Sequence, residues 1–166
     1  MMHAQLMRRL EHPGRKVRMV LDTDTYNEID DQFAVTYALL SPEAVEVEAL
    51  YAAPFHNRLS TGPADGMEKS YREILRILPL LGREDVPVFR GSTEYLPGDG
   101  GFVESEAARD LVRRAMASPP DDPLVVAAIG AITNVASALR MEPGIAGRIV
   151  VVWLGGHSFQ WPDTRE

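Results

Sequence analysis

The chain alternates short apolar runs with segments whose apolar residues recur every three or four positions. The apolar runs predict buried strands at residues 17–21, 45–52, 86–89, 124–129 and 148–154. The periodic segments predict helices at residues 30–40, 67–81, 103–117 and 133–140. A chain that repeats strand then helix is typical of a parallel sheet with helices packed on it. We therefore expect an α/β fold with an open, doubly wound, mainly parallel sheet of the Rossmann-like type.

The domain organisation follows from the absence of any linker, internal repeat or low-complexity stretch in the sequence. We expect residues 1–166 to form a single α/β domain. The last expected strand is followed only by residues 158–166, which show no regular pattern. Parallel sheets are covered by helices on both faces, and no crossover helix follows this strand. We therefore expect the chain to be truncated mid-fold, as the N-terminal portion of a larger domain.

Composition excludes several classes of protein. The chain has 17 Lys and Arg against 24 Asp and Glu, a net charge of −7, and it lacks the basic stripe of a nucleic-acid binder. It has no cysteine, which excludes a disulfide framework and a thiolate zinc site and makes the cytoplasm the expected location. No apolar run approaches the length that spans a membrane. We expect neither nucleic acid nor membrane as a partner.

Four carboxylates, those of Asp22, Asp24, Asp30 and Asp31, lie within ten residues between the first expected strand and helix. They would repel one another, and a hard divalent cation with oxygen ligands relieves that repulsion. Each has a structural explanation when taken alone, as a helix cap, a charge that complements the helix dipole, or a turn residue. The four taken together favour a metal site.

Polar residues and glycines follow the other expected strands. Asn57 comes after the second strand, Ile129-Gly130 after the fourth, and Gly155-Gly156 after the fifth. In an open α/β sheet, ligands bind in the crevice at the carboxyl ends of the strands. We therefore expect these positions to share one edge of the sheet with the aspartates. Trp153, inside the last expected strand, is expected in the core.

These motifs resemble one known family. The run Val20-Leu21-Asp22-Thr23-Asp24, followed by Ile29-Asp30-Asp31, resembles the N-terminal aspartate signature of the inosine-uridine-type nucleoside hydrolases. The resemblance continues through Asn57 and residues 84–91, 130–134 and 153–156. The order and spacing of these separate blocks make the resemblance specific. It implies the N-terminal part of the nucleoside hydrolase fold.

The resemblance also implies an activity and a cofactor, namely calcium-dependent hydrolysis of the N-glycosidic bond of ribonucleosides to ribose and free base. Asp24 and Asp31 match metal-ligating aspartates. Ile129 matches a residue that ligates the metal through its backbone carbonyl. Asp24 also matches the general base that takes a proton from the attacking water. The expected partner is a small-molecule ribonucleoside, and the expected assembly is a homo-oligomer.

Three further residues have implied roles. Asp30 matches an aspartate that binds a ribose hydroxyl, and Asn57 matches an asparagine near the ribose. Asp22 matches an aspartate that supports the metal-binding loop from behind. The loop at residues 25–29 is two residues longer than is usual in the family, which affects the geometry of the base. The family supplies further ligands from a C-terminal half, so we expect the 166-residue piece alone to be inactive.

Two alternatives remain open at this point. Residues 19–25 also fit the pattern of a haloacid-dehalogenase-like phosphatase, with Asp22 as nucleophile and Mg²⁺ beside it. That family needs a late acidic pair after a strand, where this chain has Gly155-Gly156. A non-catalytic sugar- or nucleoside-binding module is the other alternative. Calcium-dependent release of base would distinguish the hydrolase from both, and phosphate release would identify the phosphatase.

Overall fold

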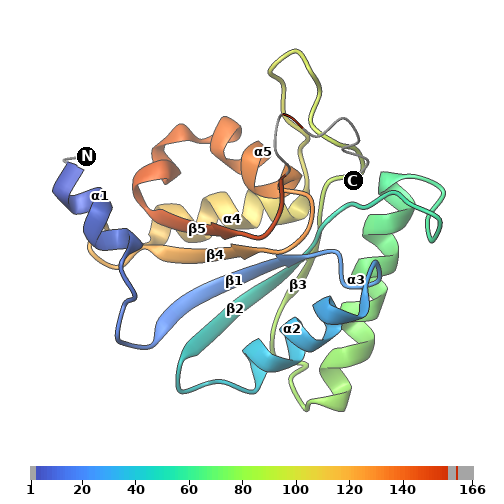
Figure 1. Ribbon diagram of the computed structural model, residues 1–166, viewed down its shortest axis with the longest axis horizontal. Helices are drawn as coiled ribbons and strands as arrows, with labels where there is room; N and C mark the ends of the chain where they lie inside the picture. The colour runs from blue at the N-terminus through green and yellow to red at the C-terminus, as the bar shows by residue number, and fades with distance from the viewer. Residues whose placement is uncertain (1–2, 157–159, 161–166) are drawn as a thin grey trace.

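The structure is a computed structural model that describes residues 3–156 and residue 160 (Figure 1). Its strands are β1 (Val17–Thr23), β2 (Val45–Ala52), β3 (Val88–Arg90), β4 (Leu124–Ala128) and β5 (Ile149–Trp153). Its helices are α1 (His3–Leu10), α2 (Ile29–Leu39), α3 (Pro63–Leu80), α4 (Glu106–Ala117), α5 (Thr133–Met141) and the 3₁₀ helix η1 (Pro143–Gly147). None of the helices in the described part of the chain is long and apolar enough to cross a membrane.

The strands form one sheet in the order β3-β2-β1-β4-β5, and every neighbouring pair is parallel. The chain builds outward from β1 to β3, then returns to the other side of β1 to add β4 and β5. The strand order therefore reverses between β1 and β4, which is where open α/β sheets bind their ligands. The expected doubly wound parallel sheet is confirmed.

Two hydrophobic clusters hold the helices on opposite faces of the sheet (Figure 1). Successive residues of β1 alternate between them, because strand side chains point to opposite faces in turn. Leu21 packs with α2 and α3 on one face, and Val20 packs with α4 and α5 on the other. This alternation explains why β1 is an almost continuous apolar run, since both of its faces are buried.

The structure departs from the expected element boundaries where local chemistry sets them. Helix α3 begins at Pro63, four residues earlier than expected, because proline fits the first turn of a helix. Helix α4 begins later, at Glu106, because the side chain of Ser105 accepts a hydrogen bond from the Ala108 amide and caps the helix. Helices α1 and η1 were not expected, and Arg9 of α1 donates to the Gly147 carbonyl of η1 at 2.7 Å.

The prediction that Trp153 lies in the core is wrong. Its side chain is 45% exposed, and its indole N–H donates to the carbonyl of Gly130 at 3.1 Å. Val152 and Leu154 beside it are also exposed. Strand β5 is an edge strand of the sheet, and the described helices leave its C-terminal half uncovered.

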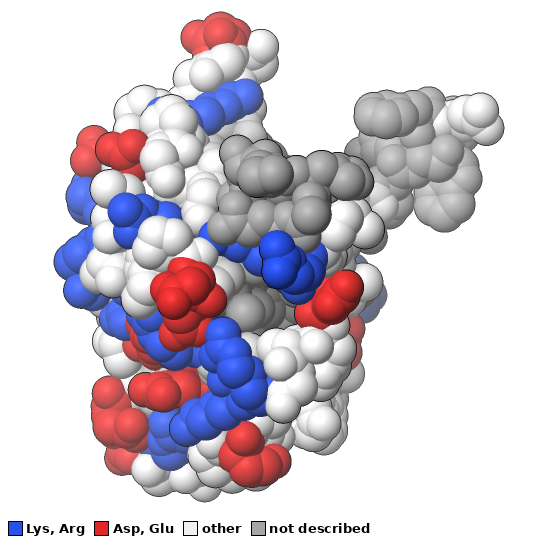
Figure 2. All heavy atoms as spheres, turned by 90° about the vertical axis from the view of Figure 1, so that its left-hand side faces the viewer, with Lys and Arg blue, Asp and Glu red and all other residues white. Residues whose placement is uncertain are grey.

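Charged side chains clamp α4 to the sheet. The guanidinium of Arg114 donates to Asp110 at 2.5 Å and to Glu48 of β2 at 2.9 Å. The buried hydroxyl of Tyr51 donates to the same Asp110 at 2.9 Å, and burial raises the pKa of this tyrosine well above its usual value. On the surface, Figure 2 shows basic and acidic side chains interspersed on the face in view, without a region of one sign.

Substituting Gly66 by alanine tests the packing of α3 on the loop after β2. A Cβ atom at this position would lie 2.0 Å from the carbonyl oxygen of Phe55, so the helix would have to move. We expect Gly66→Ala to lower the free energy of unfolding by about 1–3 kcal/mol, measured by urea denaturation. Gly62→Ala is the control, because a Cβ there meets nothing within 4 Å. Equal losses in the two variants would contradict this account of the packing.

Candidate active site

The candidate site lies at the carboxyl ends of β1 and β4, where the strand order reverses. Asp22 is the partner of Ala128 in the sheet, and the Ile129 amide donates to the Asp22 carbonyl at 2.9 Å. Beyond that point, a Cβ atom at Gly130 would lie 2.8 Å from Oδ1 of Asp24. The absence of a side chain at Gly130 therefore lets the end of β4 approach the carboxylate of Asp24.

The loop between β1 and α2 forms a turn. The Asn27 amide N–H donates to the Asp24 carbonyl at 2.6 Å, which closes the turn. The Asn27 side chain donates to Oδ2 of Asp24 at 3.0 Å and accepts a hydrogen bond from Nδ2 of Asn57 at 2.5 Å. Tyr26 and Glu28 are exposed to solvent. Asn27 thus joins Asp24 to Asn57, two of the residues that the sequence places in the site.

The two aspartates at the start of α2 point in different directions. Asp31 is buried, and the Thr23 hydroxyl lies 2.6 Å from its Oδ1. The hydroxyl of Thr23 also lies 2.9 Å from that of Thr25, which is fully buried. Asp30 is exposed. The first turn of α2 therefore directs Asp31 toward β1 and leaves Asp30 accessible from solvent.

Asp22 is a carboxylate enclosed by the fold. Its side chain is fully buried, and its Oδ1 accepts a hydrogen bond from Nδ2 of Asn134 at 2.8 Å. Its Oδ2 is buried without any hydrogen-bond partner. A buried carboxylate oxygen without a partner is costly in free energy, so this atom favours a proton or a cation nearby.

Asn134 is the residue that sequence reasoning missed. It is fully buried on α5, and its side-chain oxygen accepts from the Ser92 amide at 2.7 Å and lies 2.9 Å from the Ser92 hydroxyl. Its amide nitrogen donates to Asp22 and to the Ala52 carbonyl at 3.2 Å. A Cβ at Gly91 would lie 2.4 Å from that nitrogen. The only sequence signal for Asn134 is its place in the 130–134 block of the family resemblance.

Burial is the main cause of the raised pKa values in this cluster. It raises the pKa of Asp22 and of Asp31 to about 7, and that of Asp24 to about 6. The hydrogen bonds from Asn134, Thr23 and Asn27 act in the opposite direction on Asp22, Asp31 and Asp24 respectively. Without a counter-charge these three carboxylates resist ionisation, so this end of the sheet favours protons or a bound cation.

The donor atoms suit a hard cation, because carboxylate, carbonyl and amide oxygens are the ligands of Ca²⁺ and Mg²⁺. The orphaned Oδ2 of Asp22 also fits a positive charge close to this carboxylate. Within residues 3–156 and 160, however, no group of three or more His, Asp or Glu side chains is arranged to hold a metal ion. The four-carboxylate cluster expected from the sequence therefore does not form a complete metal centre in this part of the chain.

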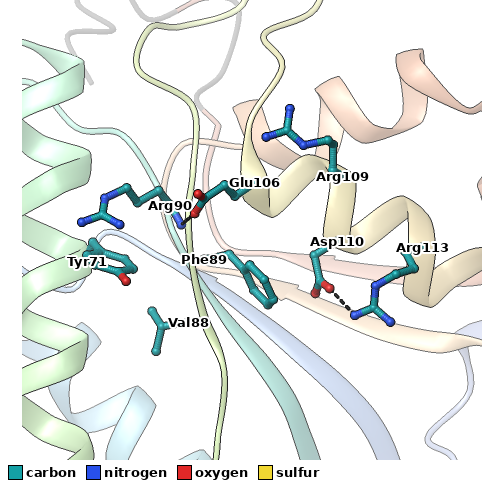
Figure 3. Close-up of a pocket in the computed structure, with 8 residues that line it drawn as sticks. All are labelled: Tyr71, Val88, Phe89, Arg90, Glu106, Arg109, Asp110 and Arg113. Carbon is teal, nitrogen blue, oxygen red and sulfur yellow. Dashed lines mark hydrogen bonds and ion pairs between the residues drawn. The ribbon is translucent and has the colours of Figure 1, made fainter.

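A separate open cavity of about 520 Å³ lies between α3, β3 and α4 (Figure 3). Each of its three arginines already pairs with a carboxylate: Arg90 with Glu68, Arg109 with Glu104 and Arg113 with Asp110. The Arg90 amide donates to Glu106, which blunts the free edge of β3. With its charges satisfied internally and none of Asp22, Asp24, Asp30 and Asp31 in its lining, this cavity is a less suitable site than the end of β1.

The stability of the metal-free protein should depend on the pH of the solution. Asp22 has a folded-state pKa near 7 and an ordinary unfolded value near 4, so the folded state keeps its proton to higher pH. The free energy of unfolding should therefore fall between about pH 4 and pH 7. Urea denaturation with a chelator present should show a smaller fall in Asp22→Asn than in the unsubstituted protein. An equal or larger fall in the variant would contradict the assignment.

Asn134→Ala should be among the most destabilising single substitutions in the chain. It leaves the buried Ser92 amide and the Asp22 carboxylate without partners, so we expect a loss of about 3 kcal/mol or more. Ser137→Ala is the matched control, because Ser137 is also buried on α5 but accepts one hydrogen bond, from the Val103 amide. Urea denaturation of both variants would show similar losses if Asn134 had no special role.

Comparison with known proteins gives the family. The family model described as inosine-uridine preferring nucleoside hydrolase matches residues 19–164. The chain is 30% identical over 149 residues to the pyrimidine-specific ribonucleoside hydrolase RihA of Citrobacter koseri, covering 76% of this chain and 45% of that protein. It is 28% identical over 168 residues to the probable uridine nucleosidase 2 of Arabidopsis thaliana, covering 86% of this chain and 48% of that protein.

Solved structures of nucleoside hydrolases also match this chain. A purine-preferring ribonucleoside hydrolase from Gardnerella vaginalis has a TM-score of 0.61 and 26% identity, covering 84% of this chain and 49% of that one. An inosine-guanosine nucleoside hydrolase has a TM-score of 0.64 and 24% identity, covering 87% and 50%, and shows the same fold. The chain spans about half the length of the curated relatives it matches. The sequence blocks, the parallel sheet and these matches agree, and the chain belongs to the inosine-uridine preferring nucleoside hydrolase family.

Proposed function

We propose that this chain is the N-terminal, aspartate-bearing part of a ribonucleoside hydrolase. That enzyme cleaves N-glycosidic bonds with Ca²⁺ as cofactor. The observation that supports it most directly is the position of Asp24. Its carboxylate lies at the reversal point of the sheet, beside Gly130 and joined to Asn57 through Asn27. An enzyme that attacks a sugar carbon with water needs a carboxylate of this kind in the crevice that binds the sugar.

The proposed metal ligands are the carboxylates of Asp24 and Asp31 and the backbone carbonyl of Ile129. All three belong to segments that meet at the ends of β1 and β4, and all offer the oxygen atoms that Ca²⁺ prefers. The chemistry that Ca²⁺ supplies when bound is the activation of water and the anchoring of sugar hydroxyls. Since the described residues hold only part of a metal centre, further ligands have to come from elsewhere.

Residues of this chain have the remaining roles in catalysis and sugar binding. Asp24 accepts the proton of the attacking water, and the positive charge of bound Ca²⁺ would keep its carboxylate ionised for that role. The exposed carboxylate of Asp30 accepts a hydrogen bond from a ribose hydroxyl, and Asn57 positions the sugar. Asp22 holds the end of β1 in place through Asn134. Cleavage develops positive charge on the ribose, which the neighbouring carboxylates stabilise.

The proposal also includes a cellular location and an assembly for this protein. We propose a cytoplasmic location, because the chain has no cysteine that would suit it to an oxidising compartment, and a homo-oligomeric assembly. Among the matched proteins one is described as pyrimidine-specific and another as purine-preferring, so the base is left open. We also propose that residues 1–166 need the remainder of the family domain for turnover.

Substitution of Asp24 tests the proposal. Asp24→Asn removes a metal ligand and the proton acceptor together, so Ca²⁺ affinity measured by titration calorimetry should fall at least about tenfold. Asp121→Asn, an exposed aspartate outside the site, should leave that affinity unchanged. In a protein that includes the remainder of the domain, Asp24→Asn should slow base release by about 10²–10⁴. Asn57→Ala should slow it less.

The substrate panel for this assay includes uridine, cytidine, inosine and guanosine, with base release followed by absorbance. A phosphomonoester is assayed in parallel by phosphate release. Phosphate release that is lost in Asp22→Asn but retained in Asp24→Asn would contradict the hydrolase and support the phosphatase alternative. Ribonucleoside binding without base release in the longer protein would contradict catalysis and support a binding module.

A further inference from the structure

A row of three hydrogen bonds connects the loop after β2 to the carboxylate of Asp24. The backbone N–H of Leu59 donates to Oδ1 of Asn57 at 2.9 Å. Nδ2 of Asn57 donates to Oδ1 of Asn27 at 2.5 Å, and Nδ2 of Asn27 donates to Oδ2 of Asp24 at 3.0 Å. We call the side chains of Asn57 and Asn27, with these three hydrogen bonds, the asparagine relay. It joins two loops that are 30 residues apart in the sequence.

The asparagine relay has a fixed direction. A backbone N–H can only donate, so Leu59 requires the oxygen of Asn57 on its side, and the Asn57 nitrogen faces Asn27. The Asn27 oxygen then faces Asn57, which leaves its nitrogen to face Asp24. An ionised carboxylate can only accept, so the requirement at the other end is the same. Turning either amide over would bring two donors or two acceptors into contact.

The two carboxylate oxygens of Asp24 have different neighbours. Oδ2 accepts from Asn27, whereas a Cβ atom at Gly130 would lie 2.8 Å from Oδ1. Oδ1 therefore faces the end of β4, where Gly130 follows Ile129, whose carbonyl is a proposed metal ligand. The terminal torsion of an aspartate side chain has a broad energy profile, so the carboxylate does not keep one orientation by itself. The hydrogen bond from Asn27 determines which oxygen faces β4.

The asparagine relay runs from the surface into the fold. Asn57 is exposed and Asn27 is half-buried, whereas only 6% of Asp24 is exposed. Both asparagines are also anchored through their backbone. The Asn27 amide donates to the Asp24 carbonyl at 2.6 Å, and the Asn57 amide donates to the Ser60 hydroxyl at 3.3 Å. A ligand that contacts Asn57 therefore acts on a side chain that is connected to Asp24.

We propose that Asn27 is a positioning residue for the reaction: it keeps Oδ1 of Asp24 turned toward β4, and it couples this carboxylate to Asn57, which positions the sugar. The coupling sets the separation between the group that accepts the proton and a group that holds the ribose. This separation matters, because misplacing reacting groups by about 1 Å can slow a reaction about a hundredfold. The inference rests on the proposed function for the roles of Asp24 and Asn57.

A simpler role for Asn27 would be to close the turn after β1. Its backbone N–H makes the turn-closing hydrogen bond to the Asp24 carbonyl, and every residue except proline has that N–H. Substitutions of Asn27 by other residues therefore keep this hydrogen bond and change only the side chain. Asn27→Asp is the most informative, because it preserves the shape of the side chain and replaces the N–H that faces Asp24 with an oxygen. A side chain that only fills space would tolerate this change.

The first test observes the asparagine relay by NMR in the 166-residue chain, without calcium or nucleoside. The chain has three asparagines, so labelling asparagine with ¹⁵N gives side-chain amide signals from Asn27, Asn57 and Asn134. Asp24→Ala should move the signals of Asn27 and also those of Asn57, which donates to Asn27 rather than to Asp24. In an Asn27→Ala background, Asp24→Ala should leave the Asn57 signals in place. The Asn134 signals report that the buried cluster around Asp22 stays folded.

Two results of the NMR test would overturn the inference. The first is an Asn57 signal that is the same with and without the Asp24 carboxylate. The second is an Asn57 signal that moves to the same extent in the Asn27→Ala background, because the effect would then reach Asn57 without Asn27. A response of Asn57 that requires Asn27 supports the coupling.

The second test measures nucleoside cleavage in a protein that includes the remainder of the family domain. At saturating Ca²⁺ and nucleoside, Asn27→Ala should lower kcat by about tenfold to a hundredfold, because Asp24 loses its fixed orientation. KM should change little, because Asn27 is not proposed to contact the nucleoside. Asn27→Asp should lower kcat at least as much, since two acceptors then face each other at Asp24.

Gln32→Glu is the matched control for the change from amide to acid. Nε2 of Gln32 donates to Glu73 of α3 at 2.9 Å, so this variant also places two carboxylates against each other, in a contact outside the asparagine relay. It should leave kcat unchanged. Near-normal kcat in Asn27→Asp, or an equal loss in Gln32→Glu, would contradict the positioning role. Absence of base release even without substitutions would instead be a failure of the proposed function, because the coupling seen by NMR does not depend on cleavage.

Discussion

The burial of a carboxylate at the end of the central strand is the constraint on which the rest of this sheet end depends. Asp22 is fully buried, and Asn134 of α5 donates to one of its oxygens. The same asparagine binds the chain at the end of β2 and the loop after β3. Segments far apart in the sequence are therefore held around one carboxylate. Its low-dielectric surroundings make each of these hydrogen bonds important, since none can be replaced by water.

Close backbone approach is the second requirement of the site. Gly130 allows the end of β4 to reach Asp24, and Gly91 allows the chain after β3 to reach Asn134. Both glycines lie beside a polar side chain that the fold encloses. Side chains at either position would separate the strand ends and open the cluster to solvent. The crevice thus depends on the lack of a side chain at Gly130 and at Gly91 as much as on the carboxylates.

Sequence periodicity was sufficient for the sheet and for most of its helices, because strands buried on both faces are nearly continuous apolar runs. It was insufficient at the ends of elements, where a single cap such as Ser105 decides the boundary. It placed Trp153 in the core, because an apolar pattern does not say which strand is outermost. The roles of Asn134 and Asn27 depend on contacts between distant segments. One sequence without its fold contains no signal for such contacts.

The hydrogen bonds of Asn27 have a consequence for the thermodynamics of ligand binding. This side chain fixes Asp24 from one side and Asn57 from the other, within a turn closed by its own backbone. A loop without such a bridge would sample many conformations and would lose that freedom when a ligand arrived. Here the loss of conformational entropy occurs during folding, so the carboxylate is preorganised before binding. Asn27 thereby acts as an internal brace of the loop after β1.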